Sequence, residues 1–454
     1  NYRCAFCAGL IIARFFWSRL AMQNVDALSE DYWFCLPPDQ TVRTDKMPMK
    51  IQDINIGDRV LTHVGSYRKV METSKRDYSG ELVTITPTFT LPITLTENHP
   101  VLVKRFIKNG KKQILQSHTV GDLEISGGHI RKLWIKAGEL LLSDQILIPK
   151  CTRIGVPRKY IEFGKYNKMT KGPKANKIPD KVIIDDDLMW LVGLYIAEGW
   201  ISRQSTLTMN QKTEKEILNK AANIINEKLN LTSRYKSGLS VYHLVVDSKS
   251  LGVMLDDMIG SGARNKHLPE FWNSLSDSHL ASLIRGCWIG DGTTRGIVKY
   301  TTISETLARQ IHQALLRFDI LSTIKYAEYD NAFRLIIPVK YHDRFFSLMN
   351  WKKPSLNEYT GYCRHKSKEN KWGFWIGIDK IDRMKYNGPV YNLNIETPNS
   401  FNIDGVAIHN CKLAKQHGFP VMVNSRVFCN HESQFTEVGP EGLVTSLRSA
   451  GDVS

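Results

Sequence analysis

Two nine-residue segments of this 454-residue chain match each other position by position. Residues 191–199 read LVGLYIAEG, and residues 284–292 read IRGCWIGDG. Each has small residues at the same two places, then an acid and a final glycine. Small residues let two helix backbones approach closely. The pair therefore predicts two helices packed face to face inside an internally duplicated unit.

The surroundings of the two segments repeat as well. From about residue 187, and again from about 280, the pattern predicts a helix, strands, a second helix and more strands. The expected helices are residues 188–197, 214–229, 281–289 and 305–318. The expected strands are residues 207–209, 241–246, 297–302 and 333–338. We expect a mixed α+β unit with two similar lobes over residues 181–350.

Strand-like runs lie on both sides of this unit. They are residues 81–85, 91–95, 132–135, 145–148, 373–378 and 390–395, and the expected turns include Gly57-Asp58 and Ser79-Gly80. The pattern predicts one all-β unit, formed from residues 35–150 and 351–410 and interrupted by the mixed unit. Residues 151–180 are basic and contain Pro and Gly, which is typical of a linker or a plain surface loop.

The net charge is +16, from 61 Lys and Arg against 45 Asp and Glu. Such a surplus fits either a polyanionic partner or a well-solvated basic surface, and composition does not separate the two. Eight cysteines in a chain of this length do not form a disulfide framework. No stretch approaches the roughly 20 apolar residues of a membrane span, so we expect no membrane partner. We also expect a monomer in the cytoplasm. The chain opens at Asn1, so we expect a fragment of a longer reading frame.

Four segments in order resemble the conserved blocks of inteins, which are self-splicing protein inserts. They are residues 35–42 (CLPPDQTV), 96–101 (TENHPV), 390–401 and 405–411 (GVAIHNC). The resemblance covers residues 35–410 and implies an all-β, horseshoe-like Hint splicing domain formed by both ends of the insert. Hedgehog-type autoprocessing domains share the fold, but they lack the terminal His-Asn-Cys.

At the first junction, the resemblance implies that the Cys35 thiol attacks the Phe34 carbonyl and turns that peptide bond into a thioester. A thiol suits this step because it is both a good nucleophile and a good leaving group. Thr96 and His99 would polarise and protonate the scissile amide.

At the second junction, the resemblance implies that Cys411 takes over the acyl group and that Asn410 cyclises onto its own carbonyl, helped by His409. No cofactor is needed for splicing. The chain departs from many inteins at Asn392, where an Asp is common, and at Asn399, where a His is common. An amide cannot act as a charged acid–base group, so the departure at Asn392 bears on the rate of transthioesterification.

The paired nine-residue segments resemble the LAGLIDADG motif of DOD-type homing endonucleases, which cut double-stranded DNA. The resemblance implies that Glu198 and Asp291 meet at the helix ends and hold Mg²⁺ against the scissile phosphates. Lys266, within residues 265–271, would assist water activation; the alternative is a surface lysine before a proline. Expected DNA contacts are Arg203, Lys212, Arg234, Lys236, Arg295, Lys299 and Arg334. The alternative function is an intein that splices but carries an inactive endonuclease.

The flanking segments, residues 1–34 and 411–454, would be the interrupted host protein. Joined together, they resemble the distal part of family 2 glycosyltransferases. The resemblance implies a catalytic base at Glu30 or Asp31 and a metal ligand at His431. The C-x-x-C spacing also suggests a zinc site, although the apolar stretch around the first two ligands favours a core position; its ligands would be Cys4, Cys7, Cys429 and His431.

Overall fold

The computed structural model describes residues 34–106, 125–126, 130–167, 178–201, 205–210, 215–237, 241–354 and 367–410. The expectations for Arg203, Lys212, Cys411 and the flanking segments lie outside these residues. Contacts divide the chain into two units, and one of them spans Cys35–Asn410. All the described residues except Phe34 belong to that unit. None of its described helices is long and apolar enough to cross a bilayer.

Strands from both ends of this unit form one 13-stranded sheet, whose main path runs β2-β1-β22-β23-β6-β9-β21-β4-β3. The strands of the first half are β1 (Thr41–Val42), β2 (Met49–Lys50), β3 (Arg59–Leu61), β4 (Tyr67–Pro87), β5 (Ile93–Thr96), β6 (Pro100–Phe106), β7 (Ile125–Ser126), β8 (Ile130–Lys136) and β9 (Gln145–Pro149). The second half supplies β20 (Lys368–Glu369), β21 (Gly373–Ile395), β22 (Ser400–Ile403) and β23 (Val406–His409). Because β22 and β23 lie between β1 and β6, the two flanks fold as one sheet-rich part, as the sequence predicted.

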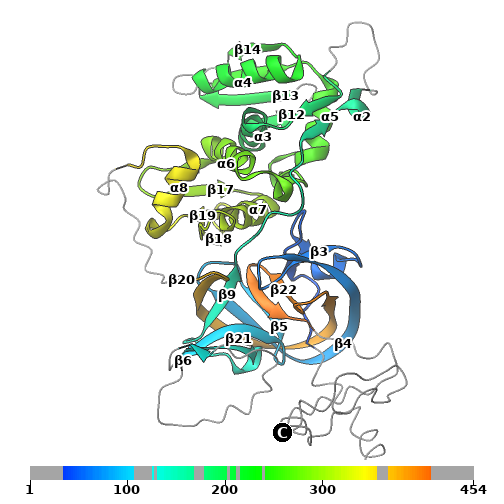
Figure 1. Cartoon of the computed structure of the whole chain (residues 1–454), viewed down its shortest axis with the longest axis vertical. Helices are drawn as coiled ribbons and strands as arrows, with labels where there is room; N and C mark the ends of the chain where they lie inside the picture. The colour runs from blue at the N-terminus through cyan, green and yellow to red at the C-terminus, as the bar shows by residue number, and fades with distance from the viewer. Residues whose placement is uncertain are drawn as a thin grey trace, which may run out of the picture. The chain divides into compact units, whose positions relative to one another are not determined.

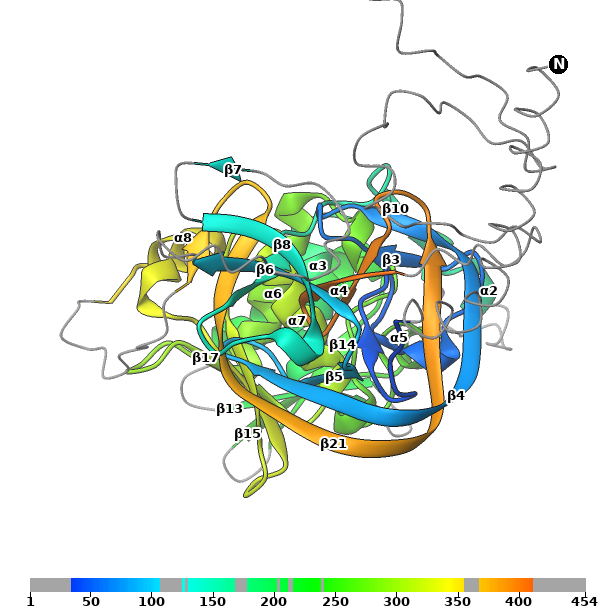
Figure 2. The ribbon, with the colours of Figure 1, turned by 90° about the horizontal axis from the view of Figure 1, so that it is seen from below.

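The strands β4 and β21 are unusually long and pair antiparallel over most of their length, as Figure 2 shows in blue and orange. The prediction of a turn at Ser79-Gly80 is wrong, because β4 runs straight through it. Gly80 has a different reason to be there. A Cβ at this position would lie 2.4 Å from the Tyr78 hydroxyl oxygen, so the missing side chain leaves room for that ring.

The middle of the chain forms two lobes with the same order of elements (Figure 1). The first lobe contains α3 (Asp186–Glu198), β12 (Gly199–Ile201), β13 (Ser205–Asn210), α4 (Lys215–Leu229), β14 (Ser233–Ser237), β15 (Val241–Val246) and α5 (Lys249–Ile259). The second contains α6 (Asp277–Asp291), β16 (Gly292–Thr293), β17 (Lys299–Thr302), α7 (Glu305–Leu316), β18 (Thr323–Ala327), β19 (Ala332–Ile336) and α8 (His342–Met349). The sheet orders β12-β13-β15-β14 and β16-β17-β19-β18 are equivalent, so the duplication extends to topology.

Equivalent helices of the two lobes begin at equivalent caps. The Asp185 carboxylate accepts a hydrogen bond from the Leu188 amide at the start of α3, and the Ser276 hydroxyl accepts one from the His279 amide at the start of α6. Such side chains satisfy amides that have no partner within the helix. Both helices start earlier than the apolar pattern predicted, because their first turns are polar and exposed.

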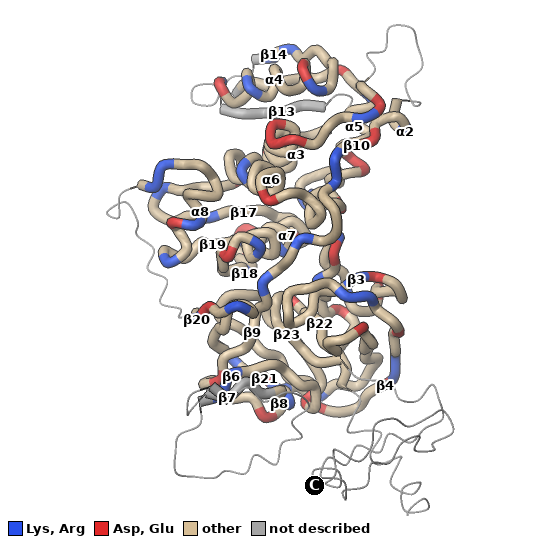
Figure 3. The backbone as a smooth tube through the Cα atoms, in the orientation of Figure 1, with Lys and Arg blue, Asp and Glu red and all other residues tan. Residues whose placement is uncertain are grey.

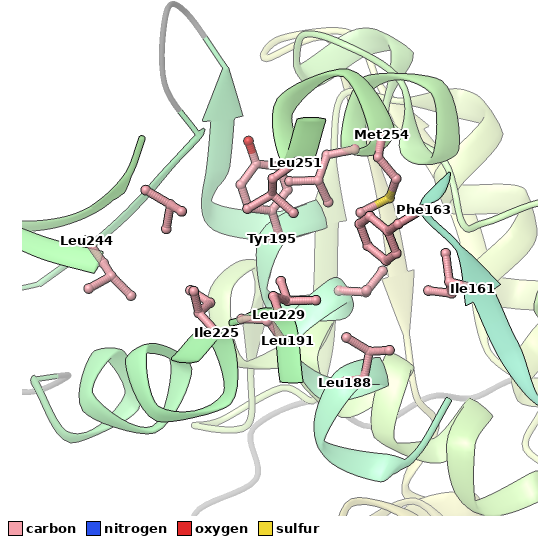
Figure 4. A pocket seen from close by; sticks show the side chains of 13 residues that line it. Ile161, Phe163, Leu188, Leu191, Tyr195, Ile225, Leu229, Leu244, Leu251 and Met254 are labelled. Atoms are coloured by element: carbon pink, nitrogen blue, oxygen red, sulfur yellow. The ribbon is translucent and has the colours of Figure 1, made fainter. Parts of the chain in front are cut away.

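The prediction that residues 151–180 form a linker or loop holds for residues 151–159 but is wrong for residues 160–167, most of which form regular elements. Strand β10 (Tyr160–Glu162) pairs with β11 (Lys181–Ile183), and α2 spans Gly164–Asn167. Ile161 and Phe163 line a small apolar cavity of about 40 Å³ between α3, α4 and α5 (Figure 4). The alternating apolar residues in this basic stretch therefore belong to the core of the first lobe.

Candidate active sites

Cys35 is buried, with 1% of its surface exposed, and it sits against the end of β5. Its amide donates a hydrogen bond of 3.1 Å to the Thr96 hydroxyl, and Nδ1 of His99 lies 3.2 Å from the Cys35 carbonyl oxygen. Two hydrogen bonds of 2.8 Å join Leu36 to Tyr391 of β21. The structure thus brings together the three residues predicted for the first junction.

The same imidazole reaches the second junction. Nε2 of His99 lies 3.0 Å from the His409 carbonyl oxygen, and Nδ1 of His409 lies 2.6 Å from the Asn410 carbonyl oxygen. Asn410 is fully buried. Its amide group donates to Oδ1 of Asn394 at 3.4 Å, a contact that the sequence motifs did not predict. Within the described residues, Oδ1 of Asn410 makes no hydrogen bond.

Burial sets the protonation states at this site. It lowers the pKa of His99 to about 3, although the two carbonyl contacts oppose the shift. A neutral imidazole carries a single N–H, so His99 can donate to one junction at a time. Burial also raises the pKa of the Cys35 thiol. Asn392 is buried and turned to its own backbone, where Oδ1 accepts from the Leu393 amide at 2.8 Å.

The second candidate site lies where α3 and α6 meet. A Cβ added to Gly193 would lie 2.0 Å from the Leu283 carbonyl oxygen, and one added to Gly286 would lie 2.2 Å from that of Trp190. The helices therefore touch backbone to backbone, which is why small residues occupy these positions. A Cβ at Gly290 would lie 2.9 Å from Oε1 of Glu198, one residue before Asp291. The two acids thus end neighbouring helices side by side.

The carboxylates of Glu198 and Asp291 repel each other when both are ionised. Burial and the nearby Glu198 charge raise the pKa of Asp291 to about 7. The Tyr300 hydroxyl donates to Oδ2 of Asp291 at 3.3 Å. A divalent cation fits here, because carboxylate oxygens are its preferred ligands and its charge would relieve the repulsion. Within the described residues no cluster of three or more His, Cys, Asp or Glu forms a metal site, so the fit rests on this pair.

Lys266 is buried rather than on the surface, which rules out the alternative that the sequence left open. Its ammonium group donates hydrogen bonds of 3.0 Å to the carbonyls of Tyr195 and Gly199, at the end of α3. Burial lowers its pKa to about 8. Lys266 also lines a cavity of about 500 Å³ together with Asp291, Trp200 and Thr301. It is therefore close to the acids and caps the helix that carries Glu198.

The sheet of the second lobe presents basic side chains on one face. Tyr300 and Leu335 are buried, so alternation places Lys299 and Arg334 on the opposite face. Lys325, which was not among the predicted DNA contacts, pairs with Arg334 in the register of β18 and β19 and is exposed. Arg334 also forms an ion pair with Asp330. Arg295 is exposed in the connection between β16 and β17.

The first lobe has exposed basic residues on its edge strand β14. Arg234 and Lys236 of β14 are exposed and lie opposite Val245 and His243 of β15. Arg234 forms an ion pair of 3.0 Å with Asp247, so part of its charge is already balanced. Figure 3 shows Lys and Arg distributed over both lobes and over the large sheet, with acids between them. The basic surplus is thus spread out, and the lobe sheets carry a share of it.

Comparisons with known proteins support part of this picture. Residues 278–350 match the family described as "LAGLIDADG-like domain", so the second lobe is a LAGLIDADG-like domain. The chain is 27% identical over 403 residues to an uncharacterized protein of Methanocaldococcus jannaschii, covering 83% of this chain and 50% of that protein. It is 25% identical to the ATP-dependent DNA helicase Hel308 of Thermococcus kodakarensis, covering 86% and 37% respectively. An iron-sulfur cluster assembly SufBD family protein of Mycobacterium tuberculosis is 23% identical, with coverage of 83% and 43%.

The chain spans half or less of the length of these curated relatives. Among solved structures, it is similar to mesophilic variants of the homing endonuclease I-DmoI, with 16% identity, a TM-score of 0.32 and coverage of 37% of this chain and 98% of that one. It is also similar to the homing endonuclease I-WcaI bound to its DNA recognition sequence, with 13% identity, a TM-score of 0.27 and coverage of 41% and 85%.

Proposed function

We propose that residues 35–410 form an intein, which excises itself from its host protein, and that its two-lobed part cuts double-stranded DNA. The main observation behind the proposal is that the two ends of this unit meet at one point in the structure. Cys35 and His409, at opposite ends of the unit, both contact one imidazole, that of His99, through their carbonyl oxygens, and Asn410 directly follows His409. Structural roles rarely require a buried Cys, Thr, His and Asn at one point of a sheet, whereas acyl transfer requires such groups.

The relatives support the proposal through their diversity. Their names describe a helicase, an iron–sulfur assembly protein, an RNA polymerase subunit and a DNA polymerase. The first two share more than four fifths of this chain, yet the shared part is less than half of each relative. A self-splicing insert present in unrelated hosts accounts for this pattern. The host of this chain, proposed as a family 2 glycosyltransferase, lies outside the described residues.

At the first junction the Cys35 sulfur forms a bond to the Phe34 carbonyl carbon while the bond to the Cys35 nitrogen breaks. The thiol proton ends on the released amine. The Thr96 hydroxyl, already 3.1 Å from that nitrogen, holds the leaving group in place. Since burial keeps His99 neutral at pH 7, it is able to take and return a proton without a change of net charge over the cycle.

At the second junction the acyl group passes from Cys35 to Cys411. The Asn410 side-chain nitrogen then attacks its own backbone carbonyl and releases the downstream segment as a succinimide is formed. Nδ1 of His409, 2.6 Å from that carbonyl oxygen, is placed to donate to it as negative charge develops. A shift from sulfur to nitrogen leaves Phe34 joined to Cys411 by a peptide bond.

For the nuclease, Glu198 and Asp291 are the residues that would hold Mg²⁺. When bound, the metal supplies Lewis acidity toward the phosphate and activates water. Lys266 keeps the end of α3 in place and adds positive charge beside the scissile phosphate. The basic faces of the two lobe sheets would bind the DNA backbone. Because both acids belong to one chain, we propose a monomer.

Splicing is tested by the intact mass of the expressed 454-residue chain beside its Asn410→Ala variant. We expect two products from the wild type, namely residues 35–410 and a ligated chain with Phe34 bonded to Cys411. The variant should give no ligation. A single uncut mass from the wild type under reducing conditions at neutral pH refutes the splicing proposal.

Cleavage is tested with supercoiled DNA carrying the uninterrupted host gene, in Mg²⁺, with Glu198→Gln and with Arg344→Gln as a surface control. We expect the Glu198 variant to lose at least about 100-fold in cutting rate, since it loses half of the carboxylate pair. Both variants should splice normally. Cutting by the Glu198 variant at the wild-type rate refutes the assignment, while no cutting by the wild type favours an intein with an inactive endonuclease.

A further inference from the structure

Strand β4 places a basic side chain on the face of the sheet that holds Cys35. The bridge between Leu36 and Tyr391 sets Cys35 opposite Asn392, and the register of β21 with β4 pairs Asn392 with Ser74 and Val390 with Arg76. Side chains two residues apart on a strand share a face. Arg76 therefore lies diagonally across from Cys35 and points to the same side.

The burial pattern of β4 agrees with this placement. Lys75 and Asp77 are exposed, whereas Arg76 and Tyr78 are partly buried, as expected when alternate residues face inward. The Arg76 guanidinium hydrogen-bonds the Cys35 side chain and opposes the effect of burial on the pKa of the thiol. The Tyr78 ring lies 5.6 Å from the guanidinium carbon, a cation–π contact that holds the group in place.

We propose that Arg76 stabilises the thiolate of Cys35 as it attacks the Phe34 carbonyl. The proposal rests on the splicing function above and adds a residue to it. Position 392, on the same face of the sheet, carries an uncharged amide whose oxygen accepts from the Leu393 amide. A fixed cation beside the sulfur lowers the energy of the thiolate.

The proton balance limits the role of Arg76. A guanidinium has no acceptor and stays protonated in proteins, so it does not remove the thiol proton, which passes to the released amine. His99 and Tyr78 near the thiol are neutral at pH 7: burial lowers the pKa of His99, and burial together with the Glu97 charge raises the pKa of Tyr78. Arg76 acts by lowering the cost of the buried negative charge on sulfur.

The experiment uses the full chain with Asn410→Ala and Cys411→Ala, which stops the reaction at the thioester. Hydroxylamine then releases residues 1–34, and mass spectrometry follows the rate between pH 6.5 and 9.5. For Arg76→Gln we expect the pH at which the release rate begins to rise to increase by about one unit. The rate at pH 7 should then fall about tenfold. Arg76→Lys should recover at least half of the shift.

Lys75→Gln removes a neighbouring positive charge from the opposite face of β4 and should leave the profile unchanged. An Arg76→Gln profile that does not move, or a loss of rate that is equal at every pH, overturns the proposal and leaves Arg76 a packing role. Cys35→Ala in the same chain is the control for the splicing function. If hydroxylamine releases residues 1–34 no faster from the parent chain than from this variant, the splicing function itself is refuted.

Discussion

At the scale of single residues, Asp291 shows how the acid pair at the ends of α3 and α6 stores an unfavourable charge. Burial and Glu198 raise its pKa to about 7, against 3.8 for the free side chain. The folded protein therefore binds this proton more tightly than the unfolded chain does. It follows that the metal-free protein loses stability as pH rises from about 4 through about 7. A bound divalent cation would reverse this loss.

We predict that Asp291→Asn raises the melting temperature of the metal-free protein at pH 8 by about 4 °C and leaves it unchanged near pH 4. Calcium ions should stabilise the wild type at pH 8 and have no such effect on the variant. The measurement is thermal unfolding with EDTA or Ca²⁺, and Asp53→Asn, an exposed acid, is the control. An equal pH dependence in the wild type and the Asp291 variant contradicts the prediction.

At the scale of elements, the contact between α3 and α6 depends on two glycines. A Cβ on Gly286 would overlap the Trp190 carbonyl oxygen and lie 2.6 Å from the Leu194 amide nitrogen. These are backbone atoms, so neither helix can yield without moving as a whole. Any increase in the helix separation also moves Glu198 away from Asp291.

We predict that Gly286→Ala costs about 3 kcal/mol of unfolding free energy and lowers DNA cutting more than tenfold. Gly164→Ala is the matched control, because its Cβ would meet only Asp180 at ordinary contact distances of 3.5 Å or more. Urea unfolding and plasmid cleavage provide the two measurements. A stable, active Gly286→Ala protein would show that the helices are not held by this contact.

The element scale also shows what the sequence could predict. The helix pair followed from matched small residues, whereas the chemistry proposed for Cys35 and Asn410 rests on short motifs. The long strand β21 was anticipated only at its two ends, because residues 379–389 are polar and mostly exposed and carry no apolar alternation. Arg76 was missed because the role proposed for it depends on the register between two strands that are far apart in the sequence.

At the scale of the whole described unit, the two-lobed part and the large sheet are joined by polar contacts. The indole nitrogen of Trp272 and the amide of Gln310 both donate to the Lys46 carbonyl, at 2.9 and 3.2 Å. Arg309 of α7 forms an ion pair with Asp404, in the turn between β22 and β23. Polar contacts between distant residues leave no periodic signal, so the sequence could not reveal them. They nevertheless link the two-lobed part to the hairpin that ends beside Asn410.

The ion pair of Arg309 and Asp404 makes this link testable. Both side chains are largely buried, with 12% and 7% of their surface exposed. Asp404 also has a left-handed backbone, at φ 46°, a conformation typical of tight turns. Removing one partner of a buried pair leaves an uncompensated charge, which typically costs about 3–5 kcal/mol.

We therefore predict that Arg309→Met, in a chain blocked by Asn410→Ala, lowers the unfolding free energy by about 3 kcal/mol in urea. Adding Asp404→Asn should recover more than half of this loss, because the stranded charge is removed. Arg344→Gln breaks a more exposed pair with Glu369 and should cost less than about 1 kcal/mol. With Asn410 restored, Arg309→Met should also slow cleavage at the second junction, since the turn that positions β23 loses its anchor. Unchanged stability and unchanged cleavage together would mean that the two parts fold and react independently.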